Sequence, residues 1–170
     1  MIPIISVVGK SNVGKTTLLE KLLIEIKKRG YRVATIKHDV HGFDIDKPGK
    51  DTWRHAQAGA DTVIISSPSK VAVISKVESE KTLDQVAAIP VDVDIIFTEG
   101  YKRENKPKIE VFRKGVYDEL LCGPHQLIAI ASDCQFDNGV PCFGLDDAAG
   151  LVELIEKLYL KPVCKGEVDE

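Results

Sequence analysis

The chain of 170 residues lacks the features that mark membrane or secreted proteins. No apolar run reaches the roughly 20 residues that a membrane-spanning helix needs, so no membrane association is expected. The four cysteines, Cys122, Cys134, Cys142 and Cys164, form no C-x-x-C pair, which argues against a zinc site or a redox motif. Because no signal peptide is evident at the N-terminus, we expect a cytoplasmic protein with reduced thiols.

Concentrated positive charge is also lacking. The formal net charge is -3, and the basic residues are spread along the chain. Nucleic acid is therefore not an expected partner. Internal repeats, low-complexity stretches and linker-like segments are absent, and the length suits a single domain. We predict one nucleotide-binding domain over residues 1–162 and a flexible C-terminal tail over 163–170.

The sequence does contain a complete phosphate-binding motif, G-x-x-x-x-G-K-[ST], over Gly9–Thr17. The apolar run Ile2–Val8 precedes it, as expected of a buried strand, and Leu18–Arg29 follows with apolar residues at helical spacing. The glycines let backbone N–H groups converge on anionic oxygens, and the helix start adds the positive end of its dipole. We predict a nucleoside triphosphate site formed by Gly9, Lys10, Ser11, Asn12, Val13, Gly14, Lys15, Thr16 and Thr17.

Three side chains are the candidates for chemistry at this site. Lys15 can reach the terminal phosphates, and the Thr16 hydroxyl can bind Mg²⁺, which prefers oxygen ligands. Glu99 directly follows the apolar strand Val93–Thr98, where P-loop proteins place an acidic group near the metal. We predict Lys15 and Glu99 as catalytic residues and Thr16 and Glu99 as metal ligands. No other general base is evident, which argues for slow hydrolysis or none.

The remaining apolar segments predict an α/β fold. The β-branched runs Thr62–Ile65 and Val71–Ile74 predict a hairpin, so that part of the sheet should be antiparallel. The alternating segment Lys108–Arg113 predicts a strand with one wet face. We also expect strands at Arg32–Lys37, Leu127–Ala131 and Val140–Phe143, and helices starting near Asp51, Thr82 and Asp146. The predicted architecture is a three-layer P-loop NTPase, with a mostly parallel sheet and an antiparallel hairpin.

The most polar stretch, residues 37–55, leaves the carboxyl end of a predicted strand, where open α/β sheets bind ligands. It allows three interpretations, which we rank as a lid or partner surface, a solvated loop, and a transition-metal cage. Asp39 is nearest to the strand end and is our candidate for completing the Mg²⁺ shell. The histidines and aspartates concerned are His38, Asp39, His41, Asp44, Asp46, Asp51 and His55.

Two further residues each allow two interpretations. Lys10 can reach the phosphates of a partner subunit, as an arginine finger does in trans, or it can lie exposed near an anion. Asp133 follows the buried run Leu127–Ala131. Its carboxylate can accept hydrogen bonds from guanine N–H groups, or it can form a turn or a helix cap.

Taken together, these motifs resemble the molybdopterin-guanine dinucleotide biosynthesis adapter family, MobB. The likeness runs from Ile4 to about Leu158. Its most particular part is Lys37–Ala60, and Glu99–Lys102 and Pro107–Val111 also match. The resemblance implies a GTP-binding protein with weak Mg²⁺-dependent GTPase activity. Such a protein would assist the guanylyltransferase that attaches GMP to molybdopterin in molybdenum cofactor synthesis.

The resemblance also implies a homodimer whose subunits pair or exchange strands. The hairpin Thr62–Ile74 and the strand near Ile109 are the natural donors, because unpaired edges invite another chain. Direct binding of molybdopterin is left open.

Two rival functions remain open. A P-loop small-molecule kinase would transfer the γ-phosphoryl group to an acceptor bound by the stretch of histidines and aspartates, with Glu99 or Asp44 as the base. A regulatory nucleotide sensor would bind the nucleotide without hydrolysing it.

Overall fold

The computed structural model describes residues 1–162, so the predicted tail 163–170 and Cys164 lie outside the described residues. The chain forms two compact units within the range predicted as one domain. The first comprises Met1–His38 together with the chain from Leu83 onward, and the second is the intervening segment Asp39–Thr82. No helix of the described chain is long and apolar enough to cross a membrane.

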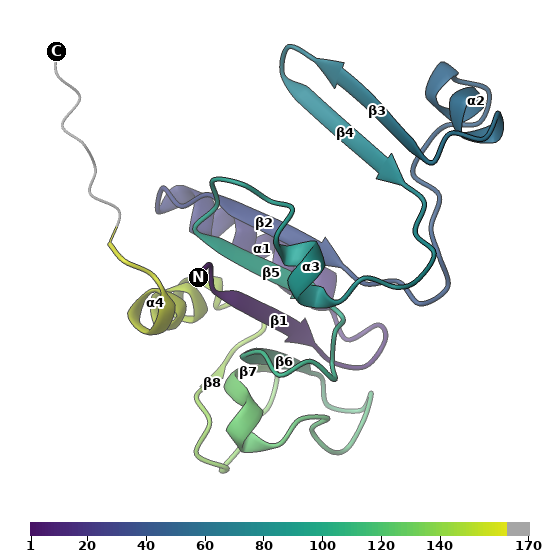
Figure 1. Cartoon of the computed structure of the whole chain (residues 1–170). Helices are drawn as coiled ribbons and strands as arrows, with labels where there is room; N and C mark the ends of the chain where they lie inside the picture. The colour runs from purple at the N-terminus through teal and green to yellow at the C-terminus, as the bar shows by residue number, and fades with distance from the viewer. Residues whose placement is uncertain (163–170) are drawn as a thin grey trace, which may run out of the picture. The chain divides into compact units, whose positions relative to one another are not determined.

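A six-stranded sheet forms the centre of the first unit (Figure 1). Its order is β2-β5-β1-β6-β7-β8, and every neighbouring pair is parallel. The predicted α/β fold is confirmed, but the expectation of antiparallel strands within this sheet is wrong. The hairpin makes a separate sheet instead. The strands are β1 (Ile4–Val8), β2 (Val33–Lys37), β5 (Ile95–Glu99), β6 (Lys108–Phe112), β7 (Leu127–Ser132) and β8 (Cys142–Phe143).

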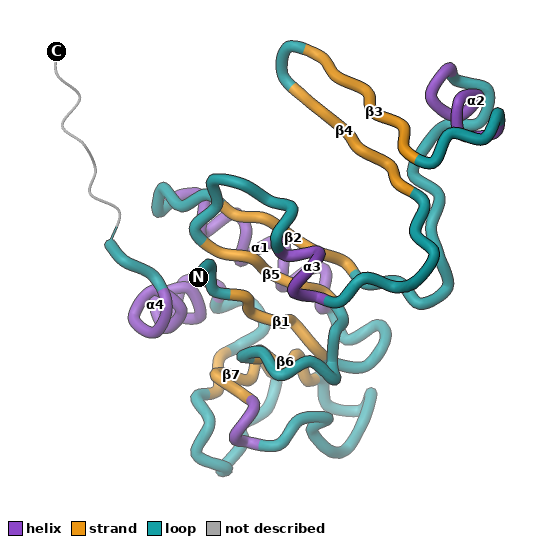
Figure 2. The backbone as a smooth tube through the Cα atoms, in the orientation of Figure 1, coloured by secondary structure: helices purple, strands orange, loops and turns teal. Residues whose placement is uncertain are grey.

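Helices cover both faces of this sheet (Figure 2). Helix α1 (Lys15–Lys28) and helix α4 (Ala148–Tyr159) pack against each other and share the larger apolar core with Ile5, Val7 and Phe97. The short helix α3 (Leu83–Ala87) joins Ile36 and Ile96 in a smaller cluster. Successive side chains of a strand point to opposite faces. The helices therefore form one layer on each side of the sheet, as a three-layer fold requires.

The helix boundaries lie close to those expected. Helix α4 begins near Asp146, as expected, and its cap is Asp147, whose side chain accepts a hydrogen bond from the backbone N–H of Gly150. Asp146 forms an ion pair with Lys21 of α1. Leu158, one residue before the end of α4, is half-exposed. The structure also has a short 3₁₀ helix at Pro124–Gln126.

Strand β6 is buried on both faces, so the prediction of one wet face is wrong. Its alternating polar residues, Lys108 and Glu110, are fully buried together with Ile109. The strand pairs with β1 on one edge and with β7 on the other. The region near Ile109 therefore has no free edge, and the expectation that it donates one is also wrong.

The two buried polar residues of β6 are hydrogen-bonded. The Lys108 ammonium donates to the carbonyl oxygens of Glu104 and Lys106, at 2.6 and 3.1 Å. The Glu110 carboxylate accepts hydrogen bonds from the backbone N–H groups of Leu121 (2.7 Å) and Cys122 (3.0 Å). Burying such groups is tolerable only when they are paired. Glu110 therefore anchors the chain that follows β6 to the sheet.

The second unit contains a short helix and a hairpin. Helix α2 (Asp51–Gln57) contacts β3 (Thr62–Ser67), which pairs antiparallel with β4 (Lys70–Ser75) in a two-stranded sheet of its own. The predicted hairpin is thus confirmed, with Ile64 opposite Val73. Helix α2 begins at Asp51, as expected, and the preceding residue, Lys50, provides no side-chain cap.

We expect Glu110→Ala to lower the free energy of unfolding by about 2–4 kcal/mol, because it removes a buried carboxylate that accepts from the N–H groups of Leu121 and of buried Cys122. Exposed Glu119→Ala removes the same group nearby and should change stability by about 0.5 kcal/mol at most. Urea unfolding followed by circular dichroism measures both. Equal stabilities of the two variants would contradict the anchoring role of Glu110.

Candidate functional site

The loop Gly9–Gly14 connects β1 to α1 and has a backbone that requires glycine at both ends. Gly9 has φ of +149°, and Gly14, the N-cap of α1, has φ of +100°. A Cβ atom on Gly9 would lie 2.6 Å from the carbonyl oxygen of Val111 in β6. The loop therefore begins in contact with the neighbouring strand, where no side chain fits. This strand, loop and helix arrangement is the one that binds phosphate in P-loop proteins.

The structure brings Thr16 and Glu99 together at the start of α1. The Thr16 hydroxyl lies 3.0 Å from one carboxylate oxygen of Glu99 and 3.1 Å from the other. Both residues line an open pocket together with Ser11, Asn12, Gly14, Lys15 and Thr17. A hydroxyl and a carboxylate side by side are hard oxygen donors. They fit Mg²⁺, which commonly binds one or two carboxylates together with substrate phosphates and waters.

Lys15 is the first residue of α1, and its side chain reaches back to the loop. Its ammonium donates a hydrogen bond to the carbonyl oxygen of Lys10 at 2.6 Å. Burial lowers the pKa of Lys15 below its ordinary value; the Glu99 carboxylate opposes this shift, and the charge of Lys102 adds to it. The ammonium is thus partly desolvated, and such a group interacts more strongly with an anion than a fully hydrated one does.

Glu99 is followed by a strained turn that places His38 beside it. The backbone N–H of His38 donates to the carbonyl oxygen of Glu99 at 3.0 Å. A Cβ atom on Gly100, whose φ is +103°, would lie 3.1 Å from the Cβ of His38. The ring of Tyr101, itself at φ of +49°, stacks on the imidazole of His38 with centroids 4.6 Å apart. These contacts hold the ends of β2 and β5 together at the site.

Lys10 points toward an aromatic ring of its own subunit. Its ammonium lies 5.0 Å from the ring centroid of Tyr117, within reach of a cation–π interaction. The Tyr117 hydroxyl lies 2.7 Å from the carbonyl oxygen of Val111 and 3.1 Å from Glu110. Burial and the charge of Glu110 raise the pKa of Tyr117, so its hydroxyl stays protonated. The role of Lys10 toward a partner subunit stays a prediction.

Asp133 and Asp39 are not among the residues that line the pocket with Thr16 and Glu99. Asp133 follows β7, and its carboxylate accepts a hydrogen bond from the backbone N–H of Lys114 at 2.9 Å. Asp39 begins the second unit, where its carboxylate accepts from the backbone N–H of His41 at 2.9 Å. Both bonds are those of turns and loop anchors. The guanine-reading role of Asp133 and the metal role of Asp39 stay predictions.

Sequence reasoning missed two residues that lie at the loop, Tyr117 and Arg113. The guanidinium of Arg113 lies 3.8 Å from the position that a Cβ atom on Gly14 would occupy. Both residues follow β6, and β6 lies beside β1. The order of parallel strands cannot be read from the sequence. No local pattern therefore connected this segment with the phosphate-binding motif.

Comparison with known proteins establishes the family. The family model described as MobB, molybdopterin guanine dinucleotide synthesis protein B, matches residues 4–133. The chain belongs to the MobB family. This membership confirms the resemblance drawn from the sequence motifs.

Individual relatives of this MobB-family chain cover most of its length. It is 38% identical over 162 residues to the molybdopterin-guanine dinucleotide biosynthesis adapter protein of Escherichia coli K12, covering 91% of this chain and 92% of that protein. The Haemophilus influenzae adapter protein is 36% identical over 135 residues, with coverage of 78% and 75%. A crystal structure of molybdopterin-guanine biosynthesis protein B matches with a TM-score of 0.73 and 30% identity, covering 93% of this chain and 99% of that one.

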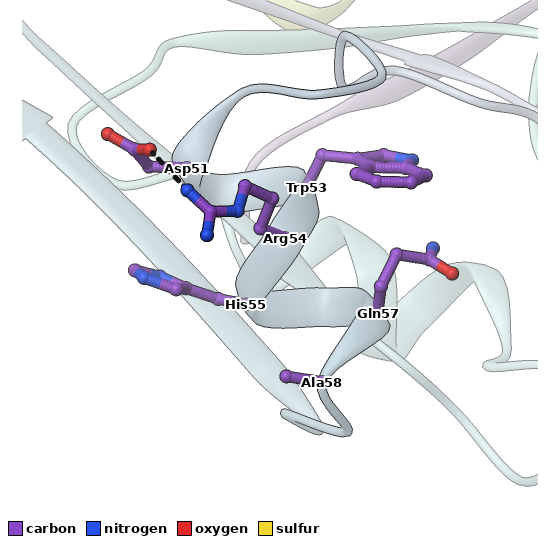
Figure 3. A pocket seen from close by; sticks show the side chains of 6 residues that line it. All are labelled: Asp51, Trp53, Arg54, His55, Gln57 and Ala58. Carbon is purple, nitrogen blue, oxygen red and sulfur yellow. Dashed lines mark ion pairs between the residues drawn. The ribbon is translucent and has the colours of Figure 1, made fainter.

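The polar stretch that resembled MobB most closely lies mainly in the second unit. Side chains of α2, including Trp53, Arg54 and His55, line a pocket, and Arg54 forms an ion pair with Asp51 at 3.9 Å (Figure 3). Within residues 1–162 no group of three or more histidine, cysteine, aspartate or glutamate side chains is placed to hold a metal ion. The transition-metal interpretation of this stretch therefore has no support in the geometry.

We expect Gly9→Ala to lower the free energy of unfolding by about 2–4 kcal/mol, because its methyl group must displace the carbonyl of Val111 and the backbone is strained as well. Gly139→Ala is the matched control. Gly139 also has positive φ, +78°, but no atom lies within 4 Å of its Cβ position, so only about 1 kcal/mol of strain is expected. Thermal unfolding of both variants tests whether the close approach to β6 is real.

Proposed function

We propose that this chain binds GTP with Mg²⁺ in the cytoplasm and acts as an adapter in the attachment of GMP to molybdopterin. One observation carries the nucleotide part of the proposal: the Thr16 hydroxyl and the Glu99 carboxylate meet at 3.0 Å beside the Lys15 ammonium. The adapter part rests on family membership and on the names of the relatives, which are adapter proteins of molybdopterin-guanine dinucleotide biosynthesis.

In the proposed complex, positively charged or N–H groups would bind the phosphates, and oxygen-bearing side chains would bind Mg²⁺. The backbone N–H groups of Gly9–Gly14 and the start of α1 would cradle the phosphates, and Lys15 would neutralise the terminal ones. Thr16 and Glu99 would hold Mg²⁺, which in turn neutralises charge on the β- and γ-phosphates. The preference for guanine rests on the family resemblance, with Asp133 as the candidate residue that reads the base.

The proposed hydrolysis is slow because the pocket offers little to activate water. Glu99 is the single carboxylate among the residues that line it. If that carboxylate holds the metal, it is not available as a general base for the attacking water. Binding without fast turnover suits an adapter that presents or retains nucleotide for a guanylyltransferase.

The proposed homodimer would form through the hairpin of the second unit. Within residues 1–162 its strands pair with each other and with no further strand. The side chains of Ile64, Ile65, Val71 and Val73 are each more than half exposed. An isolated two-stranded sheet is marginally stable in water, and its free edges invite pairing with another chain. A second copy of the hairpin would cover these apolar side chains and satisfy those edges.

The decisive experiment for nucleotide binding is Lys15→Ala. We expect GTP affinity in the presence of Mg²⁺ to fall about a hundredfold or more, because a desolvated charge–phosphate contact is lost. Isothermal titration with GTP and with ATP measures the affinity and the base preference together. Lys28→Ala, an exposed lysine at the other end of α1, is the control and should bind normally. Unchanged affinity in Lys15→Ala would overturn the proposed site.

For the dimer, we expect Val73→Lys to shift the protein from dimer to monomer in analytical ultracentrifugation, because it places a charge in the proposed apolar contact. Ile24→Lys changes a similarly exposed apolar residue on α1 and should leave the dimer intact. A wild-type chain that sediments as a monomer, or a Val73→Lys variant that sediments as wild type does, would contradict pairing through the hairpin.

A further inference from the structure

We infer that Arg113 is a second cationic contact for the phosphate chain of the nucleotide, on the side of the loop away from Glu99. This inference rests on the proposed function, since it names a further residue of the same site. In the sheet, β1 lies between β5, which ends at Glu99, and β6, which Arg113 directly follows. The metal pair Thr16–Glu99 and the guanidinium of Arg113 therefore flank the loop from opposite edges of β1.

The position of Arg113 follows from the close packing of β6 against the loop. The Val111 carbonyl occupies the space where a side chain on Gly9 would be, so the end of β6 touches the beginning of the loop. Two residues further on, Nη2 of Arg113 lies 3.8 Å from the Cβ position of Gly14. The guanidinium thus lies at the N-cap of α1. The backbone N–H groups there point toward bound phosphate in a P-loop.

The backbone around Arg113 is fixed from two directions. The carbonyl oxygen of Arg113 accepts a hydrogen bond from the backbone N–H of Val116 at 3.2 Å. The next residue, Lys114, donates its backbone N–H to the carboxylate of Asp133, at the end of β7. This gives Asp133 a structural purpose at the site, because it holds the segment that presents Arg113 to the loop.

The side chain of Arg113 is exposed and, within residues 1–162, pairs with no carboxylate. Arg29 shows the contrasting case of a structural arginine, with ion pairs to both Glu25 and Glu156. The charge of Arg113 acts on Asp146 as a minor cause: the pKa of Asp146 is lowered first by its hydrogen bond with Lys21, then by the charge of Lys21, and least by Arg113. Because Lys21 already pairs with Asp146, Arg113 remains available to another anion.

A guanidinium suits this task better than an ammonium would. Its planar fork can donate two parallel hydrogen bonds to phosphate oxygens, whereas lysine acts as a point charge. The Lys15 ammonium, which donates a hydrogen bond to the Lys10 carbonyl of the loop, already provides such a point charge. Arg113 would donate directional hydrogen bonds from the β6 side of the loop. These bonds would go to phosphate oxygens that are not bound by Lys15 or by the pair Thr16 and Glu99.

The test compares Arg113→Gln with Lys114→Gln by isothermal titration of GTP in the presence of Mg²⁺. Both changes remove one positive charge from neighbouring exposed positions, and Lys114→Gln keeps the backbone hydrogen bond to Asp133. We expect Arg113→Gln to weaken GTP binding about ten- to hundredfold, and Lys114→Gln to stay within about twofold of wild type. Arg113→Lys should restore part of the affinity, which a merely structural role would not predict.

The outcomes separate this inference from the proposed function. If the wild-type chain binds GTP and Arg113→Gln binds it within about twofold, the inference is overturned while the proposed function stands. An equal loss of GTP affinity in Lys114→Gln also overturns the inference. The affinity would then depend on the overall positive charge of this segment and not on a direct contact of Arg113 with phosphate. If the wild-type chain binds neither GTP nor ATP with Mg²⁺, the proposed function is wrong, and the inference about Arg113 is wrong as well.

Discussion

The parallel pairing of β1 with β5 on one edge and β6 on the other is the constraint on which the candidate site depends. Val7 lies opposite Glu99 in the first pair, and Val8 lies opposite Glu110 in the second. All three strands therefore end at the same edge of the sheet, where the loop begins. A slip of one residue in either register would turn Glu99 away from Thr16 or move the Val111 carbonyl out of the space beside Gly9. The register of these three strands therefore determines where the residues of the candidate site lie.

The buried charges of β6 connect the core to this edge. Removing Lys108 and Glu110 from water is costly, and the cost is offset only because each group is hydrogen-bonded. The bonds of Glu110 tie the segment after β6 back onto the sheet. This segment carries Tyr117, whose ring lies under the Lys10 ammonium, and it begins with Arg113. The hydrogen bonds of buried Glu110 thus help to position Tyr117 and Arg113 beside the loop.

Sequence reasoning identified the candidate site residues that belong to short contiguous patterns. The motif at Gly9–Thr17 and the strand-end carboxylate Glu99 were found because a contiguous pattern specifies each of them. By contrast, the alternation of β6 was misinterpreted because Lys108 and Glu110 obtain their partners from the loops that follow, not from solvent. The separate sheet of the hairpin and the position of Arg113 depend on which strands become neighbours. Residues far apart in the chain decide that order.

The side chains on and beside the loop carry more positive than negative charge. Lys15 and Arg113 lie on or beside the loop, and the described pocket contains the single carboxylate of Glu99. Burial lowers the pKa of Lys15, and the Glu99 carboxylate partly offsets this lowering. Among the described residues that line the pocket, no second carboxylate accompanies Glu99, whose oxygens lie beside the Thr16 hydroxyl. In the function proposed above, this set of groups would hold GTP with little means of activating water, which suits an adapter that retains its nucleotide.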